Sequence, residues 1–230
     1  LYVGPDTAGS FVRDSLLRVA SLAKIPVDTL YRGERLTLGA MDLKVLWPPS
    51  FIAVGGNGAS LVMQGRLSGE PQKYQAHSPR ESSAGSDPRD ASSPSSETSF
   101  LLTGDLDCAG EALLMELSAD VSSNLLQVGH HGSLGSSSLA FLNRVSPQYA
   151  VVSVGRKNSY GHPAREVLRK LEYVLGEVDG TAQDMEPRNA DGETVSSAQN
   201  SFDTLSRIYR TDRDGTVRFQ LLSGVGVLKE

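Results

Sequence analysis

The stretches "LLTGDLD" (101–107) and "LLQVGHHGSLG" (125–135) each begin as a short apolar strand and end on side chains that can bind a metal. Asp105 follows the first strand, and His130 and His131 follow the second. The chain leaves a sheet where a strand ends, so side chains at that point can reach into a cleft. Carboxylate and imidazole groups are ligands of zinc, manganese and iron. The two stretches therefore predict two neighbouring strands whose ends share a site.

Each of these residues could instead have a purely structural role. An Asp before a helix commonly caps it, but Asp107 lies immediately before the predicted helix 108–118 and is the better cap, which leaves Asp105 for another role. His130 and His131 could instead be loop histidines satisfied by hydrogen bonds. Successive side chains of an extended backbone alternate faces, so we expect one of the two to bind metal and the other to orient a ligand or contact substrate.

A third polar cluster follows a predicted strand in "VSVGRKNSYGHP" (152–163). Its members are Arg156, Lys157, Asn158, Tyr160 and His162. His162 either caps a helix predicted to begin at Pro163 or contacts substrate or metal. Donors and cations grouped at a helix N-terminus form a phosphate-binding site. Three of the four histidines of the chain lie at the ends of two strands, and this concentration favours a functional interpretation.

A serine hydrolase is a weaker alternative. Ser133 follows the histidine pair in "HHGSLG" (130–135), but a G-x-S-x-G elbow would need glycine where His131 stands. Adjacency in sequence also does not give a nucleophile and its base the geometry of a triad. We expect Ser133 to contact substrate instead.

Composition excludes several classes of protein. The chain has 230 residues, a net charge of −5 and a single cysteine, Cys108, so an internal disulfide and a thiolate zinc cluster are excluded. Its acidity disfavours broad, sequence-independent nucleic-acid binding but does not exclude a small active site that handles nucleic acid through metal ions. It lacks a signal peptide and a run of about 20 apolar residues, so we expect this piece to be soluble. Because it begins on Leu1 rather than Met, we interpret it as a fragment.

Strands and helices alternate along the chain, which predicts an α/β layered domain. Two Ser-, Pro- and acid-rich stretches, 67–97 and 177–200, cannot bury enough apolar surface to order themselves and are predicted to be flexible inserts. The remaining predicted elements are a helix at 10–24, a hairpin at 34–49, strands at 60–67, 99–104, 124–128 and 149–154, helices at 108–118, 138–145 and 163–175, and a hairpin at 205–222 with an Asp-Gly turn.

Four motifs resemble a known family. "LLTGD", "VGHHGS", "NSYGHP" and "YRTDRDGTVRF" are similar to the metallo-β-lactamase-like C-terminal domain of the bacterial competence protein ComEC family. The likeness covers nearly all of residues 1–230 except the two inserts. It implies an αββα sandwich, here incomplete at its N-terminal side, with a two-metal site that holds zinc or manganese.

The resemblance also implies roles for individual residues. Asp105 matches the bridging aspartate, and His130 or His131 matches the histidine motif. His162 and, within the same motif, Asn158 and Tyr160 are implied to contact metal or the scissile phosphate, with Arg156 and Ser133 as further substrate contacts. His131 and His162 are the implied catalytic residues. The family's upstream H-x-D-x-D-H motif does not occur in this chain.

The expected function is that of a metal-dependent phosphodiester hydrolase, a nuclease acting on DNA during competence, with little or no activity in this fragment. Partners implied by the resemblance are DNA and the membrane channel of the same parent protein, with the domain outside the cytoplasm; no nucleotide cofactor is expected. Two alternatives remain open. The chain could be a non-catalytic module that binds DNA or a channel partner, or a metallo-hydrolase for another phosphodiester.

Overall fold

The computed structural model describes residues 1–5, 11–49, 56–67, 98–117, 119–176, 207–222 and 226–229. The inserts predicted at 67–97 and 177–200 lie outside these residues, apart from Leu67, which ends a strand. Within the described ranges, no helix combines the length and the apolar content needed to span a bilayer.

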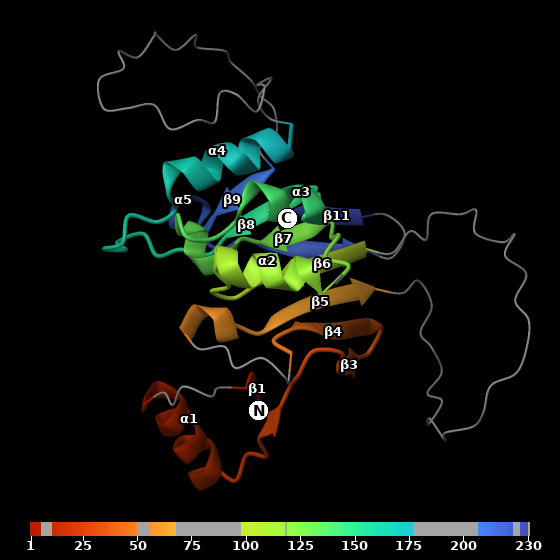
Figure 1. Cartoon of the computed structure of the whole chain (residues 1–230), viewed down its shortest axis with the longest axis vertical. Coiled ribbons are helices and arrows are strands. Elements are labelled where there is room, and N and C mark those ends of the chain that lie inside the picture. Colours follow the sequence, from red (N-terminus) through yellow and green to blue (C-terminus); the bar gives the residue numbers. More distant parts are fainter. Residues whose placement is uncertain are drawn as a thin grey trace, which may run out of the picture.

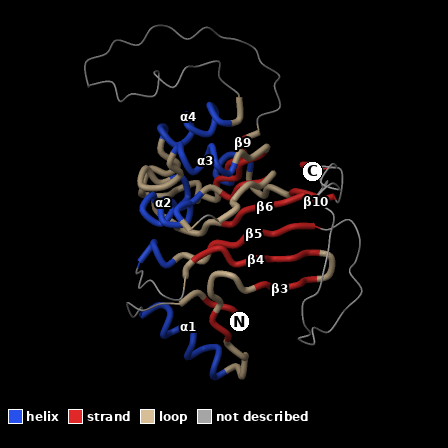
Figure 2. The backbone as a smooth tube through the Cα atoms, turned by 45° about the vertical axis from the view of Figure 1, so that its right-hand side comes forward, coloured by secondary structure: helices blue, strands red, loops and turns tan. Residues whose placement is uncertain are grey.

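A seven-stranded mixed sheet forms the centre of the described part of the chain (Figure 1). In spatial order its strands are β3 (Arg35–Leu38), β4 (Met41–Trp47), β5 (Val62–Leu67), β6 (Thr98–Leu102), β7 (Leu125–Gln127), β8 (Tyr149–Val152) and β9 (Ile208–Arg210). The strands from β3 to β6 pair antiparallel, and those from β6 to β9 pair parallel. Figure 2 shows β3 to β6 side by side. The predicted α/β class is confirmed.

Three helices cover one face of the sheet (Figure 1). They are α2 (Cys108–Glu116), α3 (Leu139–Val145) and α4 (Arg165–Val174), all close to their predicted bounds. Each contributes a fully buried leucine, namely Leu114, Leu142 and Leu171. On the sheet they meet strand residues that are at most 1% exposed, namely Val62, Leu101, Leu126, Ala150 and Val152. Burial of this apolar surface holds the parallel half together.

The opposite face of the sheet is also apolar but is only partly buried. Alternation along the paired strands puts on this face Met63, Phe100, Leu102, Leu125, Tyr149 and Val151. The ring of Phe100 lies over Gly65, where a Cβ would meet a ring carbon at 2.1 Å, so a side chain does not fit there. Parallel strands normally need cover on both faces.

A hairpin covers one part of this second face. Its strands are β10 (Phe219–Leu222) and β11 (Gly226–Lys229). The ring of Phe219 lies 5.3 Å from that of Tyr209 and 6.1 Å from that of Tyr149, centroid to centroid. These contacts bring the hairpin against β8 and β9.

The predicted hairpin at 205–222 is therefore wrong. Ile208–Arg210 instead extends the main sheet as β9, parallel to β8. The expected Asp-Gly turn is a short helix, α5 (Thr211–Asp214). Asp214 accepts a hydrogen bond from the Arg210 backbone N–H at 2.8 Å, and Asp212 forms two with the Arg210 guanidinium. The Asp214 carboxylate thus satisfies the N–H of the α5 N-cap, which favours a helical turn over a hairpin turn.

The N-terminal part lies below β3 in Figure 1. A parallel pair, β1 (Tyr2–Val3) and β2 (Asp28–Thr29), flanks α1 (Phe11–Leu22), the predicted amphipathic helix. Only Ala20 of α1 is buried. The predicted hairpin at 34–49 is confirmed as β3 and β4.

Candidate functional site

The site lies where the parallel strands β6, β7 and β8 end. Their carboxyl ends are aligned to within one residue, because Leu102 pairs with Gln127, and Gln127 pairs with Val151, the last but one residue of β8. Three segments leave the sheet from this aligned edge: the one that carries Asp105, the histidine pair, and the loop 153–163. Ligand sites of open α/β sheets form at such carboxyl ends. The sequence correctly predicted that these strand ends meet.

A tight turn after β6 presents Asp105. Thr103 is buried and its hydroxyl donates to the Gln127 carbonyl at 2.8 Å. Gly104 has φ of +55° and its α-carbon lies against Ser60, whose hydroxyl accepts the Asp105 N–H at 3.1 Å. Asp105 is left with a carboxylate that is 45% exposed.

Asp107 caps α2, as predicted. Its Oδ1 accepts the Gly110 N–H at 2.9 Å. The two acidic residues of the "GDLD" stretch thus have different positions: Asp107 is engaged by the helix, whereas the carboxylate of Asp105 points towards an imidazole.

Both histidines adopt the left-handed backbone conformation within η2 (Gly129–Gly132). His130 has φ of 47° and His131 has φ of 56°. The extended backbone assumed for this pair is therefore wrong, and alternation of faces does not apply to a left-handed turn. That one histidine binds metal while the other orients a ligand or contacts substrate stays a prediction. The turn is held by the His130 N–H, which donates to the Gly104 carbonyl at 2.9 Å. Non-glycine residues in this conformation cost free energy, and they cluster at functional sites.

His131 faces Asp105. Its Nε2 lies 3.5 Å from the Asp105 Oδ1, and its Nδ1 lies 2.6 Å from the Ser153 carbonyl oxygen. A carbonyl only accepts, so Nδ1 carries the hydrogen, and in the neutral imidazole the Nε2 lone pair is free. Of the two adjacent histidines, His131 is thus the one oriented like a metal ligand.

His130 faces a different set of groups. Its ring nitrogens lie 3.3 and 3.5 Å from the Asn57 amide nitrogen, and its ring centroid lies 5.9 Å from that of His162. Asn57 belongs to η1 (Gly56–Ala59), which the Trp47 indole anchors by donating to the Gly58 carbonyl at 2.7 Å. Sequence reasoning missed Asn57, although a polar residue between two glycines before a strand was an available signal.

The loop between β8 and α4 places the remaining predicted residues. Asn158 closes the loop on itself: its amide donates to the carbonyls of Gly155 and His162 and accepts the His162 N–H. Tyr160 stacks on His162 with ring centroids 5.7 Å apart. Arg156 is exposed and its Nε donates to the Asp212 carbonyl at 3.2 Å.

His162 does not cap α4. The N-cap is Ala164, which has no side-chain cap bond, and the helix begins at Arg165 rather than at Pro163. Pro163 packs instead against the histidine turn, where its Cβ lies 2.5 Å from the position a Cβ on Gly132 would take. The Ala164 N–H donates to the Gly132 carbonyl at 2.8 Å. The two loops are therefore packed directly together.

Ser133 follows the histidine turn and is partly buried. Its N–H donates to the His130 carbonyl at 2.9 Å, and its hydroxyl accepts from the Gly135 N–H at 3.4 Å. These bonds place Ser133 in the turn.

A buried carboxylate supports the segment that follows the histidine turn. Glu111 of α2 is 1% exposed, and its two oxygens accept the N–H groups of Ser137 and Ser138 at 2.5 and 2.9 Å. Burial raises the pKa of Glu111, and these hydrogen bonds oppose that rise. Burial, together with Glu111, also raises the pKa of the Cys108 thiol. Glu111 and Cys108 do not contact the histidines. They bind the segment after the histidine turn, Glu111 through the N–H groups of Ser137 and Ser138 and Cys108 through its own N–H to the Gly135 carbonyl.

Asp105 and His131 form the closest pair of ligand-type side chains in the site. Within the described residues, no three histidine, cysteine or acidic side chains converge as a metal-binding group. The geometry therefore offers two partly exposed side chains of ligand type, with His130 beside His131 and His162 beside His130.

No family model matches the chain. ComE operon protein 3 of Bacillus subtilis (strain 168) is 24% identical over 213 residues, which are 93% of this chain and 20% of that protein. Competence protein ComA of Neisseria gonorrhoeae is 48% identical over 73 residues, 31% of this chain and 11% of that protein. These competence-related proteins are homologues of the chain.

A third homologue is recombination protein 2 of Haemophilus influenzae, 36% identical over 86 residues, 37% of this chain and 11% of that protein. The chain spans a fifth or less of the length of these three curated relatives.

Proposed function

We propose that this chain is part of a metal-dependent phosphodiester hydrolase, a nuclease domain that serves DNA uptake in a larger competence protein. The observation that carries the proposal is the Asp105–His131 pair, in which Nε2 faces a carboxylate while Nδ1 donates to the Ser153 carbonyl. Histidines that bind metal commonly use their second nitrogen in this way. The DNA-uptake context rests on homology to competence proteins.

The proposed fold is a metallo-β-lactamase-like αββα sandwich. Its support is the partly buried apolar face that carries Phe100, Leu125 and Tyr149. The β10–β11 hairpin already packs there through Phe219. A second sheet stacked on this face would bury the remaining apolar side chains and complete a layered domain.

The residues present fit one side of a zinc or manganese site. Asp105 and His131 would hold the ion, since an oxygen and an imidazole nitrogen suit either metal. Catalytic zinc sites use three protein ligands, so we propose that further ligands come from outside the described residues. When bound, such an ion lowers the pKa of a water to about 7 and neutralises charge on a phosphoryl oxygen.

The surrounding residues have separate tasks in this proposal. The Ser153 carbonyl holds the His131 ring in place. His162, whose ring lies against that of His130, would transfer a proton to the leaving oxygen. Arg156 and Lys157 are exposed on the same loop and offer positive charge to the phosphate.

The test uses the full-length protein that contains this chain. We expect it to cleave DNA with manganese or zinc, and we expect Asp105→Asn and His131→Gln each to abolish cleavage. The matched control is Asp120→Asn, an exposed carboxylate before β7 that pairs with Arg66. Cleavage that survives both site substitutions would refute the proposal. The isolated chain, with two converging ligands, should show little or no turnover; robust turnover by it would contradict the partial site.

A second candidate is a non-catalytic module that binds DNA or a channel partner. The observation that favours it is the limited ligand set of the described residues. The two functions differ in one result: a binding module retains DNA affinity but gives no cleavage in the full-length protein with either metal. A hydrolase for another phosphodiester would instead cleave that ester in preference to DNA, and the ester would compete with DNA for the site.

A further inference from the structure

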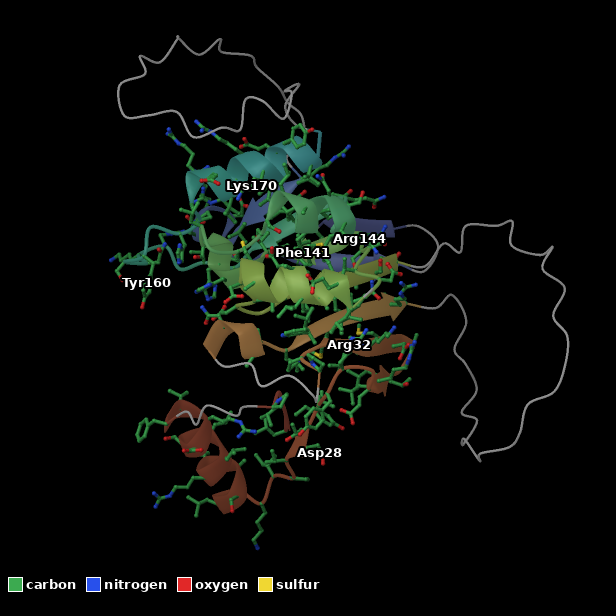
Figure 3. The ribbon with its side chains drawn as sticks, in the orientation of Figure 1. Asp28, Arg32, Phe141, Arg144, Tyr160 and Lys170 are labelled. Carbon is green, nitrogen blue, oxygen red and sulfur yellow. The ribbon has the colours of Figure 1, made fainter. Side chains whose placement is uncertain are left out.

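A loop tip next to the candidate site carries an exposed aromatic ring. Tyr160 is 81% exposed, and Figure 3 shows its side chain projecting from the body of the molecule at the tip of the loop between β8 and α4. One face of the ring stacks on the His162 imidazole, with an interplanar angle of 14°. The other face is open to a ligand.

The loop that carries the ring is held by hydrogen bonds. His162, behind it, is fixed through its backbone, because its N–H donates to the Asn158 amide oxygen at 2.9 Å and its carbonyl accepts from the same amide at 2.9 Å. Arg156 ties the start of the loop to the Asp212 carbonyl. An aromatic ring that is already ordered loses little entropy when a ligand binds to it.

The ring also begins a row of neighbouring side chains that leads to His131 and Asp105. Behind Tyr160, the His162 ring lies 5.9 Å from that of His130, which lies 6.4 Å from that of His131. His131 in turn faces Asp105. A ligand stacked on Tyr160 and extending along this row of rings would bring its phosphate towards the Asp105–His131 pair.

We propose that the open face of Tyr160 stacks an unpaired base of single-stranded DNA. This inference rests on the proposed function and assigns its substrate class. Stacking on an exposed ring is sequence-tolerant, since every base has a π-face, and it needs a base that is not covered by its neighbours. Arg156 and Lys157, exposed on the same loop, meet the adjacent phosphates. Duplex DNA does not offer a free base to this ring.

The experiment measures binding without cleavage. The 230-residue chain is titrated in EDTA against a fluorescein-labelled 12-mer of thymidine, an abasic 12-mer of the same backbone, and a duplex of the same length, with fluorescence anisotropy as the readout. Tyr160→Ala and Tyr160→Phe are compared with the control Tyr2→Ala, which removes another exposed tyrosine, from β1. Circular dichroism checks that each variant is folded.

We expect Tyr160→Ala to weaken binding of the thymidine 12-mer about 5- to 150-fold, the range that stacking of one base contributes. Tyr160→Phe and Tyr2→Ala should stay within about twofold of the wild type, since phenylalanine keeps the ring. The abasic 12-mer and the duplex should bind the wild type and Tyr160→Ala alike.

Three results would overturn the inference. They are equal binding of the thymidine 12-mer by wild type and Tyr160→Ala, an equal loss on the abasic 12-mer, or no binding of the thymidine 12-mer by the wild type. Because the measurement contains no metal, its outcome is independent of the cleavage assay. If the full-length protein cleaves DNA but this binding test fails, the proposed hydrolase activity stands and only the base-stacking inference is refuted. If the chain binds the thymidine 12-mer through Tyr160 but the full-length protein never cleaves DNA, only the proposed function is refuted.

Discussion

The buried carboxylate of Glu111 offers the sharpest test of how the histidine turn is supported. Its two oxygens accept the backbone N–H groups of Ser137 and Ser138, the latter being the N-cap of α3. Substitution by alanine leaves two buried N–H groups without an acceptor. Substitution by glutamine retains one oxygen acceptor and turns an amide NH2 towards the second N–H.

The expected loss follows from these two bonds. A buried N–H left without a partner costs about 1–3 kcal/mol. Two of them are offset in part by removal of a carboxylate that is itself costly to bury. We therefore expect Glu111→Ala to lower the free energy of unfolding by about 2–4 kcal/mol and Glu111→Gln by about 1–2 kcal/mol.

The pH dependence gives a second readout with a defined sign. Burial raises the pKa of Glu111 above its usual 4.5. The native state therefore binds more protons than the unfolded state between 4.5 and the raised pKa, and stability from this group falls as pH rises through that window. The stability difference, wild type minus Glu111→Gln, should thus shrink as pH rises from about 4.5.

Urea unfolding followed by circular dichroism, repeated across this pH range, measures both quantities. A loss below about 0.5 kcal/mol for Glu111→Ala, the usual effect of a neutral surface change, would refute the structural role. A wild-type advantage over Glu111→Gln that grows with pH would contradict the pKa argument.

Three further predictions concern stability. Gly132→Ala should destabilise the fold by about 1–3 kcal/mol, because φ is +78° and the new Cβ would meet the Pro163 Cβ at 2.5 Å; Gly155→Ala, with open space around it, is the control and should be near neutral in the same urea titration. Asp107→Ala should cost about 1 kcal/mol by loss of the α2 cap, while Asp107→Asn keeps the acceptor; equal loss in both would contradict capping. Hydrogen bonding to Arg210 lowers the pKa of Asp212 below 3.8, so its stabilising contribution is present above pH 3.8 and is lost as pH falls through the lowered value. The Asp212→Asn variant should lack this contribution in acid unfolding. An acid transition unchanged from that of the wild type would refute the prediction.

Much of the fold was predictable because local patterns and tertiary structure agree. The apolar run that ends before Thr103 and the one that ends before Gly129 are strands, and Asp107 caps the helix it precedes. Parallel pairing of those strands then brings Asp105 beside His131 without any further information. The convergence of the strand ends follows from topology alone.

What the sequence could not predict depends on contacts between distant residues. Ile208–Arg210 has the pattern of a hairpin arm, and only its partner β8, 58 residues earlier, makes it a parallel strand. The left-handed turn of His130 and His131 depends on the Gly104 carbonyl and on Pro163 against Gly132. Asn57 comes near His130 because Trp47 anchors its loop. None of these contacts has a periodic sequence signal.

The hydrogen bond from His131 to Ser153 links the chemistry of the site to the order of folding. Ser153 lies 22 residues downstream of His131, directly after β8. Until β8 pairs with β7, nothing at this position selects which imidazole nitrogen carries the hydrogen, and either tautomer is open to the ring. An intermediate in which only β6 and β7 are paired would already hold Asp105 beside the turn. In it, however, the hydrogen of the neutral His131 ring could lie on either nitrogen, so Nε2 would not be fixed as the unprotonated one. Affinity of the proposed site for metal should therefore arise in the last step of assembly of the parallel strands from β6 to β8, later than secondary structure. Stopped-flow refolding that monitors both would resolve the two events in time.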